Sequence, residues 1–292
     1  MSREGERPLP SSAQEPPVPG EEPPVPGEEL FAPAEEEPLS GGNTSAGVVR
    51  VGDTVRRPAG PWTPAVHALL EHLHAVGYRA APRPLGLDAQ GREVLTYQPG
   101  RVLWPDRFHL LGPAERLAGV ARLIREFHDA VRDFTPPPDA RWQVLMPPDG
   151  ADIIAHNDLA PWNLVVGAEH QWSFIDWDTA APGTRLWDLA YALHGFLPLS
   201  AQPDLRLADA DAAARLRVFV DAYGLDEAER RALVPLLGPR TRAMHDFLRD
   251  RAGRGVQPWA RLWEQGHGEV WRGDAEYIER RRELWLGALL DG

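Results

Sequence analysis

Hydrophobic positions recur at helical spacing in several stretches of the chain. Between Thr63 and Gly77 the apolar side chains share one face of a helix, which the glycine is expected to end. A longer helix is predicted from Pro113 to about Phe134, because the same spacing continues there until three consecutive prolines break it. Helical patterns then fill most of residues 185–292.

Short β-prone runs precede and follow the first helix. Residues 47–51 and 54–57 flank Gly52-Asp53, which predicts a tight hairpin, and residues 92–97 predict a third strand. Strand, strand, helix and strand in so short a stretch indicate a small α+β lobe. Three more apolar runs separated by polar turns follow, at 152–155, 164–166 and 172–175. We therefore predict a small mixed lobe followed by a larger, mainly helical one.

The N-terminal stretch differs in composition from the rest of the chain. Residues 1–40 contain ten of the 30 prolines, and the heptapeptide EPPVPGE occurs twice in tandem, at 15–21 and 22–28. Ten glutamates against two arginines in this stretch account for most of the net charge of −12. Such a segment buries too little to order itself, so we predict a disordered acidic leader over 1–38. A docking site for proline-binding partners is the alternative.

Composition excludes several classes of protein. The chain has no cysteine, so no disulfide holds it together, and all 31 basic residues are arginine, which excludes lysine chemistry. Its negative charge argues against nucleic-acid binding. It has no apolar run long enough to span a membrane and no signal-peptide pattern, so we expect a cytoplasmic protein with neither nucleic-acid nor membrane partners. The histidines lack zinc-site spacing, and His128 is expected on a helix surface.

The densest cluster of chemically capable side chains is the run His-Asn-Asp-Leu-Ala-Pro-Trp-Asn at 156–163, followed by Asp176 and Asp178. An aspartate and an asparagine five residues apart in one loop, with another aspartate on the next hairpin, can hold a hydroxyl, Mg²⁺ and a triphosphate together. Phosphoryl transfer needs this set. Aspartates in ordinary turns are the alternative, but the combined spacing favours a phosphoryl-transfer site.

Residues 39–290, and most specifically 156–188, resemble the aminoglycoside phosphotransferase (phosphotransferase enzyme) family, relatives of the protein kinases. The resemblance implies an α+β, bilobal, protein-kinase-like fold. It assigns a nucleotide-binding lobe to 39–102 and a catalytic, acceptor-binding lobe to 103–292. Asp188, inside an apolar helical pattern, would hydrogen-bond back to the catalytic loop as structural support.

The same resemblance assigns roles in the central cluster. Asp158 would be the catalytic base or the residue that orients the hydroxyl, and His156 would pack under the catalytic loop and fix its backbone. Asn163 and Asp176 would bind the Mg²⁺ that accompanies ATP or GTP. Asp178 is either a further metal ligand or an exposed turn residue.

The small lobe is expected to hold the nucleotide. A Gly/Ser-rich loop before the hairpin resembles one that covers phosphates with backbone N–H groups, and residues 92–100 resemble the segment that pairs with adenine. The candidate contacts are Gly41, Gly42 and Asn43 for the phosphates, and Thr96, Tyr97 and Gln98 for the base. By itself the Gly/Ser-rich segment also fits an ordinary loop.

The lack of lysine departs from the kinase pattern. Kinases place a lysine on the third strand and pair it with a glutamate on the next helix. Here the strand offers Arg56 and Arg57, which alternation places on opposite faces. Alignment with the kinase strand favours Arg56 as the phosphate-binding residue, held from the helix by Glu71 or, failing that, His67. A guanidinium can bind phosphates through its planar set of donors.

These features predict a Mg²⁺-dependent kinase that transfers the γ-phosphoryl group of ATP or GTP to a hydroxyl of an aminoglycoside-like acceptor. A hydroxylated metabolite such as an amino alcohol or a sugar is the alternative acceptor, and a weakly active nucleotide-binding regulatory protein of the same fold is the alternative function. A protein kinase is disfavoured, because the chain between Asp176 and Asp188 is too short for an activation loop.

The C-terminal part holds the candidates for acceptor binding. Its carboxylates suit a cationic acceptor, but their helical spacing beside arginines favours an ion-paired surface: Glu264, Glu269, Asp274, Glu276 and Glu279. Its tryptophans, including Trp259, Trp263, Trp271 and Trp285, suit either stacking on a ring or the core.

Overall fold

The computed structural model describes residues 35–39, 47–168 and 171–291, and the chain from Glu36 onward forms one compact unit. Gly41, Gly42 and Asn43, the predicted phosphate-binding residues, lie outside the described residues, as does most of the predicted leader. Within the described ranges, no helix is long and apolar enough to cross a membrane.

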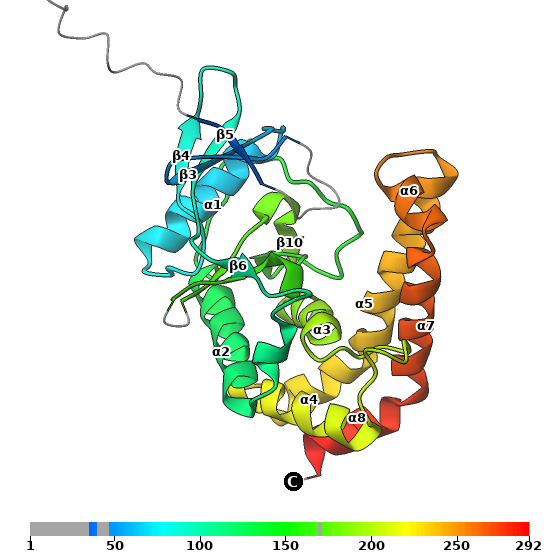
Figure 1. The fold of residues 1–292 in the computed structure, drawn as a ribbon. Helices are drawn as coiled ribbons and strands as arrows, with labels where there is room; N and C mark the ends of the chain where they lie inside the picture. The colour runs from blue at the N-terminus through cyan, green and yellow to red at the C-terminus, as the bar shows by residue number, and fades with distance from the viewer. Residues whose placement is uncertain (1–34, 40–46, 169–170, 292) are drawn as a thin grey trace, which may run out of the picture. The chain divides into compact units, whose positions relative to one another are not determined.

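An antiparallel five-stranded sheet forms the first part of this unit, in the order β1-β2-β3-β5-β4 (Figure 1). Its strands are β1 (Glu37–Pro38), β2 (Val49–Val51), β3 (Thr54–Arg57), β4 (Pro84–Leu87) and β5 (Glu93–Thr96). The predicted hairpin is confirmed: Val51 pairs with Thr54, and Gly52 supplies the positive φ of 58° that the tight turn requires. Strand β1 lies within the predicted leader, so order begins before residue 39.

Helix α1 (Thr63–Ala75) confirms the first predicted helix. Its buried face is the predicted apolar stripe, with Leu69, Leu70 and Leu73 fully buried. The chain leaves the helix at Gly77, whose φ of 95° is a conformation that favours glycine. The helix packs on β4 and on the short turn η5 (Trp177–Thr179), so it connects the sheet to the region of the predicted catalytic residues.

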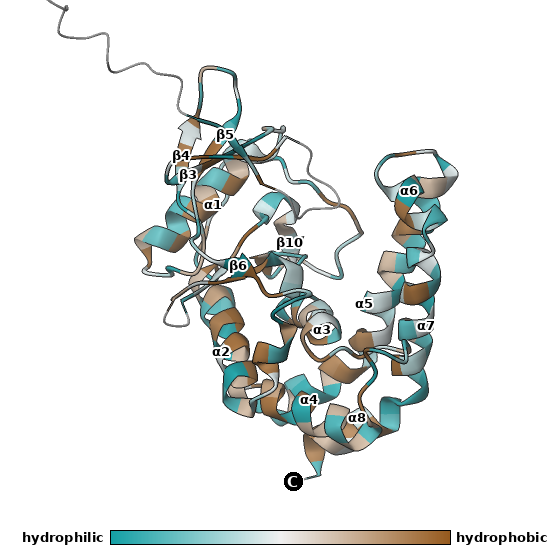
Figure 2. Cartoon of the chain, viewed as in Figure 1, coloured by the Kyte–Doolittle hydropathy of each residue, from teal (hydrophilic) through white to brown (hydrophobic). Residues whose placement is uncertain are grey.

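The remainder is mainly helical, as predicted (Figure 1). Its helices are α2 (Ala114–Ala130), α3 (Arg185–Phe196), α4 (Asp209–Tyr223), α5 (Glu227–Gly253), α6 (Trp259–Glu264), α7 (His267–Arg280) and α8 (Arg282–Leu290). Apolar and polar residues are interspersed along these helices, so most of them show both brown and teal in Figure 2. Helix α5 packs on α3 and α7, and α2 packs on α4.

Short strands between α2 and α3 carry the predicted catalytic segment. The three predicted runs are strands β7 (Ile153–Ala155), β8 (Leu164–Val166) and β9 (Trp172–Phe174). Two strands that the sequence did not indicate complete the pairing: β6 (Arg101–Val102) joins β8, and β10 (Ala181–Gly183) joins β7. The loops of these pairs lie on the helical core, which fixes their backbone.

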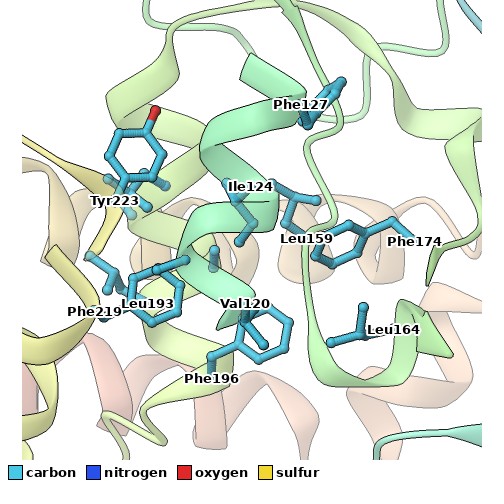
Figure 3. Packing of buried hydrophobic residues seen from close by; sticks show 14 of the residues in the cluster. Val120, Ile124, Phe127, Leu159, Leu164, Phe174, Leu193, Phe196, Phe219 and Tyr223 are labelled. Atoms are coloured by element: carbon cyan, nitrogen blue, oxygen red, sulfur yellow. The ribbon is translucent and has the colours of Figure 1, made fainter. Parts of the chain in front are cut away.

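The core beneath these strands is built from aromatic and aliphatic side chains of α2, α3 and α4 together with β8 and β9 (Figure 3). Phe127, Phe174, Phe196 and Phe219 are fully buried. Leu159, in the middle of the predicted catalytic loop, is also fully buried, and it anchors that loop in the core. Burial of side chains of this size contributes about 1.5–3 kcal/mol each, so the loop is held by packing as well as by hydrogen bonds.

Candidate active site

The predicted catalytic loop runs from the end of β7 to the short turn η3 (Pro161–Asn163), and a buried carboxylate holds its start. Asp188 of α3 accepts hydrogen bonds from the backbone N–H groups of His156 (3.0 Å) and Asn157 (2.8 Å). The ring of His128 lies 3.2 Å from the same carboxylate and 2.7 Å from the Tyr223 hydroxyl. The expectation that His128 lies on a helix surface is wrong: it is fully buried, because it partners Asp188.

These contacts keep Asp188 ionised. Burial alone would raise the pKa of Asp188, but the bonds from His128 and from the His156 N–H lower it below its usual value. The loop itself is under local strain, since Asn157 has a φ of 64° without being glycine. The Asn157 side chain donates to the Thr179 carbonyl oxygen at 3.0 Å, which ties the loop to the turn that follows Asp176.

His156 lies under the loop and joins its two halves. Its Nδ1 accepts from the backbone N–H of Asp158 (3.3 Å), and its Nε2 donates to the carbonyl oxygen of Ile175 (3.2 Å). The ring is fully buried and packs on Trp177, 4.5 Å between centroids. Burial lowers its pKa, so the imidazole is neutral, as this pair of bonds requires.

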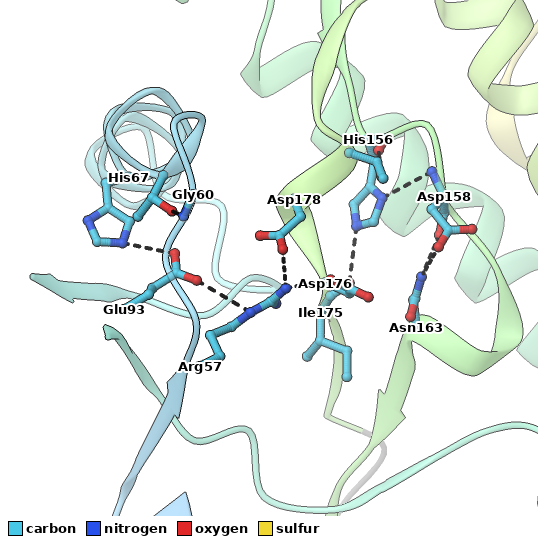
Figure 4. Close-up of polar contacts among 12 residues, drawn as sticks. Arg57, Gly60, His67, Glu93, His156, Asp158, Asn163, Ile175, Asp176 and Asp178 are labelled. Atoms are coloured by element: carbon cyan, nitrogen blue, oxygen red, sulfur yellow. Dashed lines mark hydrogen bonds and ion pairs between the residues drawn. The ribbon is translucent and has the colours of Figure 1, made fainter. Parts of the chain in front are cut away.

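Asp158 points into a cavity of about 1470 Å³. The amide of Asn163 donates to its carboxylate at 2.7 Å and to its carbonyl oxygen at 3.0 Å, which fixes the side chain (Figure 4). Burial and the charge of Asp176 raise the pKa of Asp158 to about 7, although Tyr191 and Asn163 act in the opposite direction. A carboxylate with a pKa near neutrality suits the acceptance of a proton from a hydroxyl.

Asp176 and Asp178 line the same cavity and share one cation, Arg57. Asp176 has a φ of 62°, which turns the chain sharply into η5. Arg57 Nη2 lies 3.0 Å from Asp176 Oδ1 and bonds Asp178 as well (Figure 4). Burial, together with the charges of Asp176 and Glu93, raises the pKa of Asp178 to about 6. Asp178 is therefore not an exposed turn residue.

The predicted choice between the two arginines of β3 is wrong. Val55 and Arg57, two residues apart, line the cavity, because side chains alternate along a strand. Arg56 lies on the other face, where it pairs with Asp88 at 3.4 Å. Glu71, proposed as its partner, is exposed on α1. The strand register assumed from the kinase pattern is therefore off by one residue.

Arg57 is held by a buried carboxylate that the sequence analysis did not identify. Glu93 of β5 lies directly opposite Arg57 in the sheet, 3.5 Å from its Nε, and is 1% exposed. His67 of α1 contacts the other Glu93 oxygen at 2.9 Å. Burial alone would lower the pKa of Arg57, but the charges of Asp176, Asp178 and Glu93 raise it, so the guanidinium stays charged. His67 thus acts on Arg57 through Glu93.

The donor set beside Asp158 fits a magnesium ion. Mg²⁺ takes oxygen ligands and, beside a nucleotide, draws most of them from phosphates and water. Asn163 uses its N–H group on Asp158, which leaves its carbonyl oxygen for a metal, and the Asp176 side chain is 31% exposed toward the cavity. No three His, Cys, Asp or Glu side chains of the described ranges gather as a metal site. A metal here would therefore be shared between Asn163, Asp176 and the phosphates.

The predicted base-binding segment also lines the cavity. The N–H groups of Thr96 and Tyr97 donate to the carbonyl oxygens of Arg83 (2.9 Å) and Asp53 (2.8 Å). Gln98 folds its side chain back onto Thr96 at 3.2 Å. Among the described residues this leaves the Tyr97 carbonyl oxygen and the Gln98 backbone for a nucleobase.

Of the five candidate carboxylates of the C-terminal part, Asp274 lines the cavity and the others do not, and three of those others form the expected ion-paired surface. Glu269 and Glu276 pair with Arg272, and Glu279 pairs with Arg242, outside the cavity. Glu264 is exposed and does not line the cavity. Asp274 does line it. Both its oxygens are occupied, by Ser200 (2.8 Å), the N–H of Ala201 (2.7 Å) and His194 (2.9 Å).

A sheet that carries a charged strand beside helix α1, a loop aspartate fixed by an asparagine, and a second aspartate on the next hairpin together define a protein-kinase-like phosphotransferase fold. The sequence profile of the phosphotransferase enzyme family matches residues 138–223. A trifolitoxin immunity protein of Rhizobium leguminosarum bv. trifolii is 32% identical over 252 residues, covering 77% of this chain and 90% of that protein. The chain belongs to the phosphotransferase enzyme family.

Solved structures share the fold. A choline/ethanolamine kinase family protein from Mesorhizobium loti aligns with a TM-score of 0.62 at 15% identity, covering 92% of this chain and 96% of that one. The GDP complex of aminoglycoside 2'-phosphotransferase-IIIa aligns with a TM-score of 0.56 at 15% identity, covering 85% and 92%. The predicted α+β, bilobal, protein-kinase-like fold is confirmed.

Proposed function

We propose that the protein is a cytoplasmic, Mg²⁺-dependent phosphotransferase that moves the γ-phosphoryl group of ATP or GTP to a hydroxyl group of a small molecule. One observation carries the proposal. Asp158, with a pKa raised to about 7, faces Asp176 in one cavity, and Asn163 holds the Asp158 carboxylate at 2.7 Å. This set supplies a proton acceptor and metal-binding oxygens at one place, which phosphoryl transfer requires.

Each side chain has a part in the proposed reaction. The acceptor oxygen forms a bond to the γ-phosphorus, the bond from that phosphorus to the β–γ bridging oxygen breaks, and the nucleoside diphosphate leaves. Asp158 orients the hydroxyl and takes its proton, and Asn163 keeps the Asp158 carboxylate in place. Mg²⁺ held by Asn163 and Asp176 would neutralise charge on the phosphates. Arg57 supplies the positive charge for which kinases use lysine.

Arg57 must exchange partners when nucleotide binds. It pairs with Asp176 and Asp178 in the structure, and Asp176 is also the proposed metal ligand. A metal at Asp176 would compete with the guanidinium for the carboxylate and release Arg57 toward the phosphates. Glu93 and His67 keep its Nε end fixed during this exchange.

The test is release of nucleoside diphosphate by the purified protein with Mg·ATP or Mg·GTP and a panel of hydroxyl compounds. The panel includes aminoglycosides, choline, ethanolamine and aminopropanol, since solved relatives carry such names. We expect acceptor-dependent release that disappears without Mg²⁺. Absence of Mg²⁺-dependent nucleotide binding in titrations would contradict the proposal.

The similarity to the trifolitoxin immunity protein favours a second function that is compatible with the first. Its name assigns it immunity to trifolitoxin, and the present chain covers 90% of its length. We infer that the phosphotransferase protects a cell against a toxic compound. Expression in a sensitive strain should confer resistance, and the Asp158→Asn variant should lose it. Equal protection by both proteins would separate immunity from phosphoryl transfer.

A further inference from the structure

The catalytic aspartate opens directly onto an aromatic wall. The Tyr191 hydroxyl faces Asp158 and lowers its pKa. The Tyr191 ring is stacked on Trp271, 6.0 Å between centroids and 11° between planes, and meets Trp162 edge-on at 6.4 Å. Beyond them, Trp259 of α6 lines the same cavity and is only partly buried. Aromatic faces thus extend from the reacting centre to the outer helices α6 and α7.

Most of the carboxylates that line the cavity already have partners. Five carboxylates line the described cavity. Asp176 and Asp178 bind Arg57, and Asp274 is saturated by three donors. Asp158 is the proposed proton acceptor, and Asp106 is exposed and followed in the chain by Arg107, which lines the cavity too. No cluster of unpaired carboxylates is left there for several ammonium groups.

A positive charge also lies against the aromatic wall. Arg240 of α5 is 1% exposed, lines the cavity, and lies over the Tyr191 ring at 4.2 Å. Its Nη2 donates to the Asn157 carbonyl oxygen at 2.9 Å, and among the described residues it forms no ion pair with a carboxylate. Asp188 and Asp158 attract it without forming an ion pair with it. A buried guanidinium without a direct carboxylate partner repels a second cation and attracts an electron-rich or anionic group.

Resting on the function proposed above, we propose that the acceptor is a hydroxyl compound with an aromatic or extended apolar body and no more than one positive charge. Its hydroxyl lies at Asp158, and its body packs against the partly buried rings of Trp162 and Trp259. The phosphoryl group goes to that hydroxyl and its proton to Asp158, as described above. A polycation would meet Arg240 and lack carboxylate partners, so the pocket selects against it.

A matched pair of ligands tests this assignment. 2-Naphthyl β-D-glucopyranoside and methyl β-D-glucopyranoside carry the same sugar hydroxyls and differ in the ring, and kanamycin serves as the polycation. Each is titrated calorimetrically into the full-length protein with a non-hydrolysable Mg·ATP analogue. We expect the naphthyl glucoside to bind about tenfold more tightly than the methyl glucoside, since ring stacking contributes measurably beyond area burial. Kanamycin should bind more weakly than the naphthyl glucoside.

Two tryptophan variants locate the effect. Trp259→Ala should remove most of the preference for the naphthyl glucoside. Trp263→Ala, in the same helix but outside the cavity and packed on His245, should keep it. Equal binding of the two glucosides, tighter binding of kanamycin, or a preference that survives in Trp259→Ala would overturn the inference. Binding of the nucleotide analogue in the same samples reports separately on the proposed function, so the two failures are distinguishable.

Discussion

The two ends of the cavity are built on opposite principles. At one end Asp158, Asp176, Asp178 and Arg57 form a dense set of charges, two of them with pKa values raised to about 7 and about 6. At the other end aromatic side chains dominate, and Asp274, the carboxylate that lies there, has every oxygen bonded. The charged end keeps carboxylates close together, and a bound metal ion would offset their repulsion. The aromatic end offers shape and aromatic side chains, with the buried Arg240 as its positive charge.

This difference shows where each kind of specificity resides. Reaction type depends on charges that the fold keeps close together despite their repulsion, and such charges are typical of functional sites. In this proposal, acceptor choice depends on aromatic and apolar surfaces, which cost the protein little folding free energy. The two properties can therefore change independently within one family, which explains how a shared fold accommodates different acceptors.

The largest effect is expected from removing the proton acceptor. Asp158→Asn keeps the shape of the side chain but cannot accept a proton, so turnover should fall about 10²- to 10⁴-fold. Nucleotide affinity should stay within a factor of about two, because Asp158 acts on the chemical step. Steady-state kinetics and calorimetry on the same preparation check both points. Retained turnover would remove Asp158 from the mechanism.

A smaller but sharper effect separates the two arginines of β3. Arg57→Ala should raise the nucleotide KM about 10- to 100-fold, the value of one or two charge-assisted hydrogen bonds. Arg56→Ala is the matched control, since its side chain pairs with Asp88 on the other face of the strand. It should change the KM by less than about twofold. The reverse pattern would show that the nucleotide approaches β3 from the face of Arg56.

The smallest effect concerns stability and its pH dependence. Folding raises the pKa of Asp158 from 3.8 to about 7, so the folded protein holds a proton that the unfolded chain releases between these values. Through Asp158, the free energy of unfolding therefore falls as the pH rises from about 4 to 7. Above pH 7, removing the Asp158 charge should raise the free energy of unfolding by at most about 4 kcal/mol.

Urea unfolding measures this directly. Asp158→Asn should be more stable than the wild type at pH 8, and its advantage should shrink at pH 5. The exposed Asp106→Asn variant is the control and should show no such trend. An advantage of Asp158→Asn that is equal at both pH values would show that the carboxylate is not held against its own charge.

Local patterns were sufficient for much of the fold. The hairpin at β2 and β3, the helices α1 and α2, and the strands β7, β8 and β9 followed from periodicity and from glycine and proline positions. Strands β1 and β6 consist of two residues each, and β10 contains Pro182, so no pattern could reveal them. Their pairing is a consequence of tertiary structure.

Local sequence patterns likewise predicted only some of the side chains of the candidate site. Loop spacing was enough to nominate Asp158, Asn163 and Asp176, which the structure brings to one cavity. The register of β3 could not be predicted from spacing, because a four-residue strand does not show which arginine faces inward. Glu93 offered a signal that was overlooked: an acid two residues before Leu95, and therefore on the same face as that apolar residue.

Three further contacts of the candidate site join segments that are distant in the chain, and no local sequence pattern indicated them. His128 reaches Asp188 across 60 positions of the chain, and Arg240 reaches Asn157 across 83. Tyr191 acquires its place beside Asp158 because α3 packs on α5. Only the packing of helices brings these groups together.

The separation of the two ends is tested most directly by titrating Mg·ATP and Mg·GTP into Asp176→Asn and Trp259→Ala side by side. Asp176 is proposed to share the metal with the nucleotide, so Asp176→Asn should weaken binding of the preferred nucleotide about tenfold or more. Trp259→Ala, at the aromatic end, should leave that affinity within about twofold of the wild type. Unchanged affinity in Asp176→Asn together with a loss in Trp259→Ala would contradict the account, because it would place the nucleotide at the aromatic end.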